Sequence, residues 1–451
     1  MCAIVGIYGN DDAAKLASAA LFAMQHRGHE ATGISSGGDG DDKRIFTVKN
    51  RGYVRDVFDE EAFKILKGNM AIGHNRYSTA GSESVFDAQP IHAKYKLGEI
   101  SIVHNGNLTN KDEVRQRLID EGSIFQTGMD TENLIHLIAK SSQDKLRDRI
   151  TKSLTKVKGA YNFIIQSRSK LFVIRDPHGI RPLSLGKLKS GGWIVASETC
   201  CFDLVDADFI RDVKPGEMLI FSKEYEEPES IILDDTKEFR PCAFEYIYFA
   251  RPDSDIDGKN VYTMRENMGK VLATNDKGIL DADMVIPVPD SGVPSALGYA
   301  KESGIPFELG IIRNHYVGRT FIEPTQAMRN MKVKMKLSPM KSLIEGKKLV
   351  VIDDSIVRGT TSKRIVRMLK DAGAAEVHFR VASPMIKYPC FYGIDTPTKE
   401  ELINAMKSKE EVREYIEADT LEYLSVENLK EALGDDRRYS LVSFDGDYFV
   451  A

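Results

Sequence analysis

The second residue of the chain is a cysteine in a position where it could act as a nucleophile. Cys2 follows the initiator methionine and opens the apolar run "CAIVGIYG". A residue this small permits removal of Met1, which would leave the thiol beside a free α-amine with a pKa of about 7.7–8. Such an amine can act as general base for its own side chain. The alternative is a structural cysteine at the start of a buried strand, because free cysteine is often buried.

Four further stretches carry the other groups that attack on a carboxamide requires. A cation can hold an α-carboxylate, an anion can hold an α-ammonium, and an asparagine amide beside a glycine N–H can stabilise an oxyanion. Each stretch alone is weak evidence, because glycine-rich turns with Asn and Arg are common. The stretches are "QHRGHEATGI" with Arg27, "GHNRYSTAG" with Arg76, "HNGNLTN" with Asn105 and Gly106, and "GMDTENL" with Asp130.

Taken with Cys2, these stretches resemble the class II glutamine amidotransferases, which use an N-terminal cysteine nucleophile. The resemblance covers about residues 2–235. It implies that Cys2 attacks the side-chain amide of glutamine, forms a glutamyl thioester and releases ammonia. It also implies that the other residues bind glutamine or stabilise the oxyanion. The glutamine-binding residues would be Arg27, Arg76 (for the α-carboxylate) and Asp130 (for the α-amine), and the oxyanion donors would be the Asn105 side chain and the Gly106 N–H.

The second half of the chain contains a run that is suited to a phosphate group. In "LVVIDDSIVRGTTS", an apolar strand leads into Asp353 and Asp354, and a Gly/Thr/Ser turn then opens a helix. Backbone N–H groups at such a turn, together with the helix dipole, favour a bound phosphate. The paired acids suit ribose hydroxyls or a metal ion. The alternative for two adjacent acids is a solvated acidic turn.

A second loop and a basic segment fit the same picture. In "VIPVPDSG", a strand ends at Asp290 and Ser291, which suits a diphosphate with Mg²⁺ because this ion prefers hard oxygen ligands. The segment "RNHYVGRTFIEPTQAMRNMKVKMKL" is crowded with cations, among them Arg319 and Lys334. Charge runs are usually solvated faces, but this one lies between two phosphate loops and predicts a mobile lid.

The acidic run with its Gly/Thr/Ser turn resembles the phosphoribosyl pyrophosphate (PRPP) motif of type I phosphoribosyltransferases. With "FEYIYFARPDS" at the junction, nearly the whole chain resembles the glutamine PRPP amidotransferases, a family that performs the committed first step of de novo purine synthesis. The implied reaction converts glutamine, PRPP and water to 5-phosphoribosylamine, pyrophosphate and glutamate. The implied PRPP site is Asp353, Asp354, Ser355, Arg358, Gly359, Thr360, Thr361, Ser362, Arg319 and Lys334, and the implied Mg²⁺ ligands are Ser291, Asp353 and Asp354.

The family also implies regulation and assembly. Purine nucleotides (AMP, GMP, ADP or GDP) would inhibit the enzyme, and the chain would form a homotetramer or a dimer. Some members carry an iron–sulfur cluster and a propeptide before the nucleophile. Cys242 and Cys390 stand in contexts that resemble two cluster ligands, but the C-terminal pair is missing, so no iron–sulfur cluster is expected. With Cys2 directly after Met1, no propeptide is needed.

Composition restricts the compartment and the partners. The formal charge of −5 argues against a nucleic-acid partner. No stretch approaches the roughly 18 apolar residues of a membrane span, and the N-terminus is a poor signal peptide. The five cysteines are odd in number and scattered, so no disulfide framework is supported. These features predict a cytoplasmic protein that uses neither membrane nor nucleic acid.

The elements that must position these residues change character along the chain. The first half reads as short strands with a few helices, and from about residue 245 strands alternate with helices, which predicts a parallel sheet. We place a glutaminase domain at 2–235 and a phosphoribosyltransferase domain with C-terminal helices at 236–451. The fold class is α/β: the resemblance implies an αββα sandwich followed by a doubly wound parallel sheet. The run "TKEELINAMKSKEEVREYI" predicts a surface helix with a capping box at Thr398 and Glu401.

Two other functions share some of these features. Another class II synthase would have the same first half, but its isomerase or ATP-pyrophosphatase half does not match "VIDDSIVRGTTS". A catalytically weak PRPP-sensing regulator would retain the phosphate loops, but it has no need of Cys2, Arg76 and Asn105. Glutamate release from glutamine, measured with and without PRPP, discriminates among the three.

Overall fold

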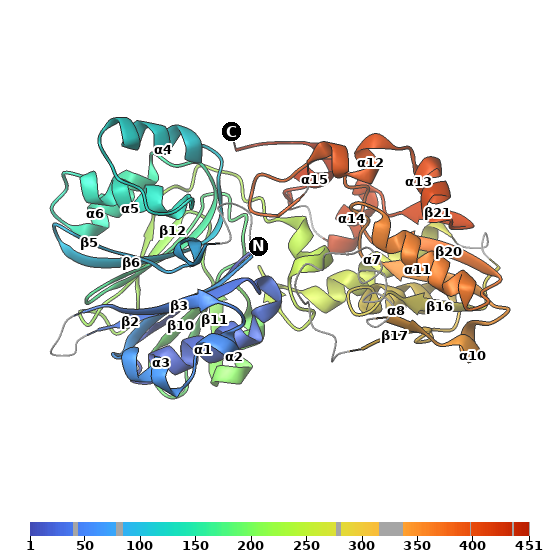
Figure 1. The fold of residues 1–451 in the computed structure, drawn as a ribbon, viewed down its shortest axis with the longest axis horizontal. Coiled ribbons are helices and arrows are strands. Elements are labelled where there is room, and N and C mark those ends of the chain that lie inside the picture. Colours follow the sequence, from blue (N-terminus) through green and yellow to red (C-terminus); the bar gives the residue numbers. More distant parts are fainter. Residues whose placement is uncertain are drawn as a thin grey trace.

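The computed structural model describes residues 1–38, 44–77, 84–276, 281–314, 337–396, 398–434 and 437–450. The chain forms two bodies that lie side by side, and Figure 1 shows both termini near their junction. The first body is built from two stacked antiparallel sheets with helices outside them. The second has a parallel sheet between helices.

The first sheet of the first body is seven-stranded and antiparallel, in the order β11-β9-β10-β1-β4-β2-β3. Its outer face is covered by three helices, and the alanine-rich face of the longest one packs against alternate residues of the central strands. The strands are β1 (Ala3–Tyr8), β2 (Ala31–Gly37), β3 (Phe46–Arg51), β4 (Met70–Arg76), β9 (Ser184–Leu188), β10 (Trp193–Ala196) and β11 (Ala207–Asp212). The helices are α1 (Ala13–Ala23), α2 (Val54–Val57) and α3 (Glu60–Ile65).

The second sheet is six-stranded and antiparallel, in the order β13-β12-β8-β7-β6-β5. Apolar side chains from both sheets, such as Ile4 and Ile164, share one buried layer, so the sheets stack face to face. This four-layer arrangement confirms the predicted αββα sandwich. The strands are β5 (Ile91–Tyr95), β6 (Gly98–Leu108), β7 (Gly159–Ser167), β8 (Leu171–Arg175), β12 (Glu217–Phe221) and β13 (Glu229–Ile232), and the covering helices are α4 (Lys111–Asp120), α5 (Thr131–Lys140) and α6 (Leu146–Leu154).

The second body contains a four-stranded parallel sheet in the order β16-β19-β20-β21. Successive residues of β19 serve opposite faces: Val350 packs with one group of helices and Val351 with the other. Helices on both faces confirm the predicted doubly wound architecture. The strands are β16 (Met284–Pro287), β19 (Lys348–Asp353), β20 (Glu376–Val381) and β21 (Thr420–Tyr423). On one face lie α7 (Val261–Asn275), α8 (Val293–Ser303) and α14 (Val426–Leu433), and on the other α11 (Thr360–Asp371) and α13 (Lys409–Ile416).

Shorter elements complete the described chain. Two small antiparallel strand pairs are β14 (Asp255–Ile256) with β15 (Lys259–Asn260) and β17 (Ile311–Arg313) with β18 (Leu337–Pro339). The short helices are α10 (Lys341–Ile344), α12 (Ile403–Met406), α15 (Val442–Asp445), the π-helix η5 (Glu245–Phe249) and the 3₁₀ turns η1 (Gln25–Arg27), η2 (Val85–Asp87), η3 (Thr199–Cys201), η4 (Asp203–Val205) and η6 (Lys399–Glu401).

The helix predicted to start at Thr398 is wrong in its extent and in its cap. The segment forms three short pieces, η6, α12 and α13, and the Thr398 side chain accepts no capping hydrogen bond. The capping box is formed instead by Ser408 and Glu411 at the start of α13. The reason is that Leu402 is fully buried in the core of the second body, which bends the chain inward before α13 begins.

The two bodies share part of one hydrophobic core. Met1, Ala160 and Ile180 of the first body pack in the same buried cluster as η5, α7 and α14 of the second. A buried ion pair also crosses the junction, with Arg175 Nη1 2.8 Å from Asp257 Oδ1. The junction is therefore a packed interior, and it lies directly behind the N-terminal segment.

Candidate active sites in the two bodies

The candidate nucleophile lies at the start of a central strand. Cys2 precedes β1, which pairs with β10 on one side and β4 on the other. The Cys2 backbone N–H donates to Asn105 Oδ1 at 3.3 Å, and the thiol donates to the Tyr77 carbonyl at 3.6 Å. Because β1 and β6 belong to facing sheets, the sandwich itself brings Cys2 to Asn105.

The two predicted oxyanion donors occupy adjacent positions on β6. Asn105 is fully buried, and among the described residues its Nδ2 has no hydrogen-bond partner. Gly106 has a φ of +147°, and a Cβ there would lie 2.0 Å from the Ala160 carbonyl oxygen. Only glycine fits this backbone, since a side chain would collide with the neighbouring strand β7.

Asp130 lies beside the same strand and is held as a carboxylate. Its Oδ2 accepts the Leu108 N–H at 2.9 Å, and its Oδ1 lies 3.2 Å from His104 Nδ1. Burial alone would raise the pKa of Asp130, but the His104 imidazole and the Leu108 N–H outweigh it and lower the pKa. His104 was not singled out from the sequence, although it stands in the "HNGNL" run that supplied Asn105.

Arg76 ends β4, the strand beside Cys2. Its backbone pairs with Ala31 of β2, and its Nη2 lies 4.0 Å from Asp87 Oδ2. Gly28 allows the preceding turn η1 to press against this strand, because a Cβ there would lie 2.6 Å from the Arg76 carbonyl carbon. Tyr77 is the next residue in the chain, and its carbonyl accepts the hydrogen bond from the Cys2 thiol, so the end of β4 lies at the nucleophile.

The guanidinium of Arg27 is buried beside Cys2, where it binds a backbone carbonyl and two carboxylates. Its Nε donates to the Cys2 carbonyl at 3.0 Å, and its Nη1 lies 2.5 Å from Glu198 Oε1. Both of its Nη atoms also donate to the carboxylate of Glu245, at 3.0 and 2.9 Å. Burial would lower the pKa of Arg27, but the two carboxylates raise it further above its ordinary value. Sequence reasoning missed Glu198 and Glu245, although Glu245 lies within "FEYIYFARPDS".

The second candidate site lies where β19 gives way to α11. Asp353 ends the strand, Asp354 begins the loop that follows, and α11 begins at Thr360 after Gly359. Gly359 has a φ of +72°, which favours glycine, and it lets the chain turn into the helix. Thr360 and Thr361 are exposed at the first turn and Ser362 is buried. The first N–H groups of α11 therefore face the loop, as a phosphate site requires.

The two acids form a strained electrostatic pair. Burial and the neighbouring Asp354 carboxylate raise the pKa of Asp353 well above its ordinary value. Burial also raises the pKa of Asp354, although hydrogen bonds from Ser291 and Ser355 partly oppose this. Gly292, beside Ser291, packs against β19, because a Cβ there would lie 2.4 Å from the Ile352 carbonyl oxygen. The predicted ligands Ser291, Asp353 and Asp354 thus come together from two loops.

The broken segment before α13 braces the phosphate loop. The Ile403 N–H donates to the Val357 carbonyl at 3.0 Å, and Asn404 Nδ2 donates to the Ile356 carbonyl at 3.3 Å. Arg358 Nε lies 3.1 Å from Glu401 Oε1, with both side chains about half exposed. This packing explains why the segment turns inward, and it replaces the surface helix expected from the sequence.

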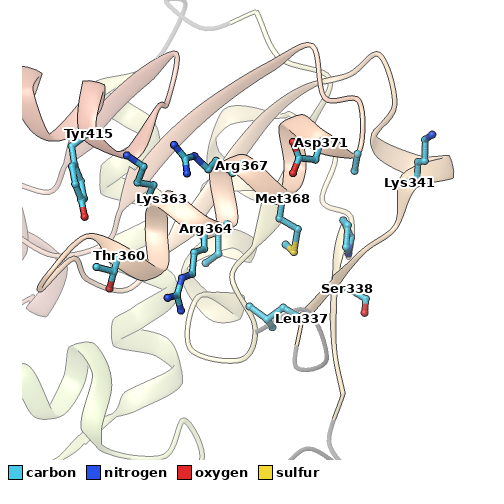
Figure 2. Close-up of a pocket in the computed structure, with 13 residues that line it drawn as sticks. Leu337, Ser338, Lys341, Thr360, Lys363, Arg364, Arg367, Met368, Asp371 and Tyr415 are labelled. Atoms are coloured by element: carbon cyan, nitrogen blue, oxygen red, sulfur yellow. The ribbon is translucent and has the colours of Figure 1, made fainter. Parts of the chain in front are cut away.

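A basic pocket of about 890 Å³ continues from the first turn of α11 along its outer face. Figure 2 shows Lys363, Arg364 and Arg367 projecting from α11, with Tyr415 facing Lys363. Thr360 of the predicted phosphate loop is also part of the lining. Arg319 and Lys334, which were predicted to contact PRPP, lie outside the described residues, and so does most of the predicted lid.

The remaining cysteines are thiols in this structure. Cys242 and Cys390 are both buried, and burial raises the pKa of Cys242 to about 11. Within the described ranges, no group of three or more His, Cys, Asp or Glu side chains is placed to hold a metal ion. No helix in those ranges is both long and apolar enough to cross a membrane.

Comparison with family models divides the chain in the same way as the two sites. A model described as a glutamine amidotransferase domain matches residues 74–203, and one described as a phosphoribosyl transferase domain matches residues 263–385. Fold, sites and models together define a glutamine amidotransferase joined to a phosphoribosyltransferase.

Full-length relatives identify the family. The chain is 49% identical to the amidophosphoribosyltransferase of Rhizobium etli over 100% of this chain and 90% of the relative. It is 47% identical to that of Bacillus subtilis over 99% and 94% of the two chains. The solved B. subtilis glutamine PRPP amidotransferase, complexed with ADP and GMP, superposes with a TM-score of 0.93 at 46% identity and covers 100% of this chain and 98% of its own. The chain therefore belongs to the amidophosphoribosyltransferase family, whose members catalyse the first step of purine biosynthesis.

Proposed function

We propose that the reaction is divided between the two sites, with ammonia made at Cys2 and used beside Asp353 and Asp354. The observation that carries the proposal is the convergence of Cys2, Asn105 and Gly106 from facing sheets. A cysteine whose backbone N–H binds a buried amide, with the amide Nδ2 unpartnered among the described residues, is suited to acyl transfer. The chemistry itself is the glutamine-dependent formation of 5-phosphoribosylamine, with pyrophosphate and glutamate as the other products.

At the first site, the thiolate of Cys2 attacks the glutamine amide carbon. The developing oxyanion takes hydrogen bonds from Asn105 Nδ2 and the Gly106 N–H, while Arg76 binds the α-carboxylate and Asp130 the α-amine. The lowered pKa of Asp130 supports the last role, because an ionised carboxylate is what an ammonium group needs. Ammonia leaves, and water then hydrolyses the thioester to glutamate. Arg27 serves this site by holding the Cys2 carbonyl.

We propose that Met1 is removed, so that the Cys2 amine becomes the general base. Its surroundings support a low pKa, since burial and the neighbouring Arg27 and Arg181 guanidiniums lower the pKa of the Met1 amine to about 5. After removal of Met1, the Cys2 amine would lie near Arg27, whose Nε donates to the Cys2 carbonyl, and in its neutral form it could take the thiol proton. Intact mass should show the loss of one methionine.

At the second site, PRPP would bind across the end of β19. The residues Arg358, Gly359, Thr360, Thr361 and Ser362 would hold its 5′-phosphate at the start of α11. Asp353 and Asp354 would face the ribose hydroxyls, and Ser355 supports Asp354 through a hydrogen bond of 2.6 Å. Arg319 and Lys334, both outside the described residues, are proposed to neutralise the leaving diphosphate.

Mg²⁺ fits the same residues. Ser291, Asp353 and Asp354 offer hard oxygen donors, and the raised pKa values of the two buried acids support a role in binding a cation. When bound, the ion would stabilise the negative charge of the diphosphate. We also propose that no iron–sulfur cluster is present, because Cys242 and Cys390 supply only two of four thiolates; a brown protein with about four irons per chain would contradict this.

Regulation and assembly are proposed from the relatives. The B. subtilis structure is complexed with ADP and GMP, which supports inhibition by AMP, GMP, ADP or GDP. We propose a homotetramer or a dimer, a domain boundary at 235/236 that follows β13, and a cytoplasmic location. Related enzymes from Arabidopsis thaliana are chloroplastic, so the compartment differs within the family.

One pair of assays tests the division of labour. Cys2→Ala should abolish glutamine-dependent synthesis and leave ammonia-dependent synthesis largely intact, because the second site is separate chemistry. Asp353→Asn should lower both activities. If Cys2→Ala lost both activities while it kept the wild-type fold by circular dichroism, the two-site proposal would be wrong.

A further inference from the structure

We infer that residues 389–396 of the second body form a positioning element for the oxyanion donor Gly106. We call them the 389–396 segment, and Asn107 and Gly393 are the residues through which it acts. This inference rests on the oxyanion role proposed for Gly106. It predicts that glutamine chemistry needs a part of the chain that lies almost 300 residues beyond Gly106 and belongs to the other fold.

The 389–396 segment lies directly on the backbone of Gly106. A Cβ built on Gly393 would lie 3.0 Å from both the Cα and the carbonyl carbon of Gly106. On its other side, Gly106 meets β7, where a Cβ would lie 2.0 Å from the Ala160 carbonyl oxygen. Two glycines thus make a backbone-to-backbone contact, and Gly106 is enclosed between a strand of its own sheet and a segment of the second body.

Asn107, the residue after Gly106, ties β6 to the segment. Its Nδ2 donates to the Phe391 carbonyl at 2.8 Å. Arg181 of the first body makes a second tie, because its Nε and Nη2 both donate to the Tyr392 carbonyl, at 2.9 and 2.5 Å. The fully buried Arg181 also lies 3.4 Å from Glu245, so its position is fixed from both bodies.

The segment has enough internal support to resist displacement. The Cys390 N–H donates to Thr396 Oγ1 at 2.6 Å, and the Tyr392 N–H donates to Cys390 Sγ at 3.3 Å. The chain end adds two braces: the Tyr448 hydroxyl donates to the Pro389 carbonyl at 2.7 Å, and the Val450 N–H donates to the Tyr392 hydroxyl at 2.8 Å. A segment held at so many points can fix the peptide plane against which it packs.

Fixing this peptide plane matters because oxyanion donors act only when they are preorganised. A hydrogen bond aimed at a developing charge stabilises the transition state more than the ground state, so a misplaced donor lowers kcat with little change in KM. A displacement of about 1 Å can cost about 100-fold in rate. The segment would therefore affect the rate of glutamine cleavage without touching glutamine.

Gly393→Ala is the direct test. The new methyl group must push Gly106 or the segment by a few tenths of an ångström, and we expect kcat for glutamine to fall roughly 10-fold with KM for glutamine within about twofold. Ammonia-dependent synthesis should stay at the wild-type rate. Asn107→Ala removes the tie without adding bulk and should lower the same kcat several-fold.

Gly434→Ala is the matched control. Gly434 lies in the second body at the end of α14 with a φ of +70°, and a Cβ there would meet no atom of the described residues within 4 Å. Like Gly393→Ala, it places an L side chain at a positive φ, but without the contact, so its glutamine kcat should equal that of the wild type. If Gly393→Ala fails to fold, Asn107→Ala decides, since its side chain is partly exposed.

Asn105→Ala separates failure of this inference from failure of the proposed function. If Asn105→Ala loses glutamine activity but Gly393→Ala and Asn107→Ala keep it, the positioning role is wrong and the oxyanion site stands. If Asn105→Ala itself keeps full activity, the proposed oxyanion site is wrong, and the inference falls with it. An equal loss of ammonia-dependent synthesis in Gly393→Ala would also overturn the inference, because it would indicate general damage.

Discussion

Two adjacent carboxylates at the end of β19 cannot both be ionised without cost. Burial raises the pKa of both Asp353 and Asp354 above the ordinary aspartate value of about 3.9, and the Asp354 carboxylate raises the pKa of Asp353 further. A cation–diphosphate complex binds the ionised pair, so binding releases protons. The affinity for this complex is therefore highest at a pH above the raised pKa values of the two acids, and it falls as the pH is lowered through those values.

We therefore expect KM for PRPP to rise as the pH is lowered, beginning well above pH 3.9. KM measured from pH 8.5 to 5.5 in the ammonia-dependent assay checks this without involving the glutamine site. Thr361→Ala is a useful comparison, because it weakens the phosphate cradle but should leave the pH dependence unchanged. A pH-independent KM for PRPP in the wild type would contradict the assignment of the pair.

Single residues also mark the limit of what the sequence predicts. Cys2, Asn105 and Gly106 could be proposed from the sequence because their motifs carry the chemistry in the residue types themselves. The partners of Arg27 could not be predicted by the same means, since Glu198 and Glu245 lie 171 and 218 residues away. Residues this far apart in the sequence meet only in the folded protein, so their spacing along the chain cannot predict the buried ion pair that they form.

The elements were predictable where one periodicity dominated. The strand before Asp353 and helix α11 could be predicted because each shows a single sequence pattern. The strand is a continuous apolar run, and α11 has apolar residues at helical spacing. The segment at 398–416 failed because two principles competed: helical spacing favoured one long helix, whereas burial of Leu402 and the turn chemistry of Ser408 broke it. Local pattern could not reveal that its inward bend supports the phosphate loop.

This bracing element suggests a way to tighten the second site. Arg358 pairs with Glu401 of η6, and to hold a phosphate it must leave that partner. Exposed pairs of this kind are worth at most about 1 kcal/mol. Glu401→Gln should therefore lower KM for PRPP by roughly two- to fivefold, with thermal stability little changed. Glu410→Gln, which removes an equivalent exposed pair with Arg413 on α13, should leave KM for PRPP unchanged.

The whole molecule has to keep ammonia from being released before an acceptor is present. We expect low glutaminase activity without PRPP and a strong increase with it. The basic segment containing Arg319 lies outside the described residues. We expect its cations to close over bound PRPP, because the diphosphate supplies the negative charge that balances them. Arg319→Ala should weaken PRPP use and PRPP stimulation of glutaminase together. Glutamine hydrolysis that is already maximal without PRPP would refute the coupling.

The shared core at the junction determines whether the two halves of the protein can fold separately. Ala160 and Ile180 are buried among residues of the second body, and Arg27 and Arg181 use Glu245 of that body as a counter-charge. A fragment ending near residue 235 would expose that apolar surface and leave two buried guanidiniums short of an anion, which is strongly destabilising. The glutaminase half is thus not a detachable module: recombination with a different synthase half would have to supply its own substitutes for Glu245 and for the 389–396 segment.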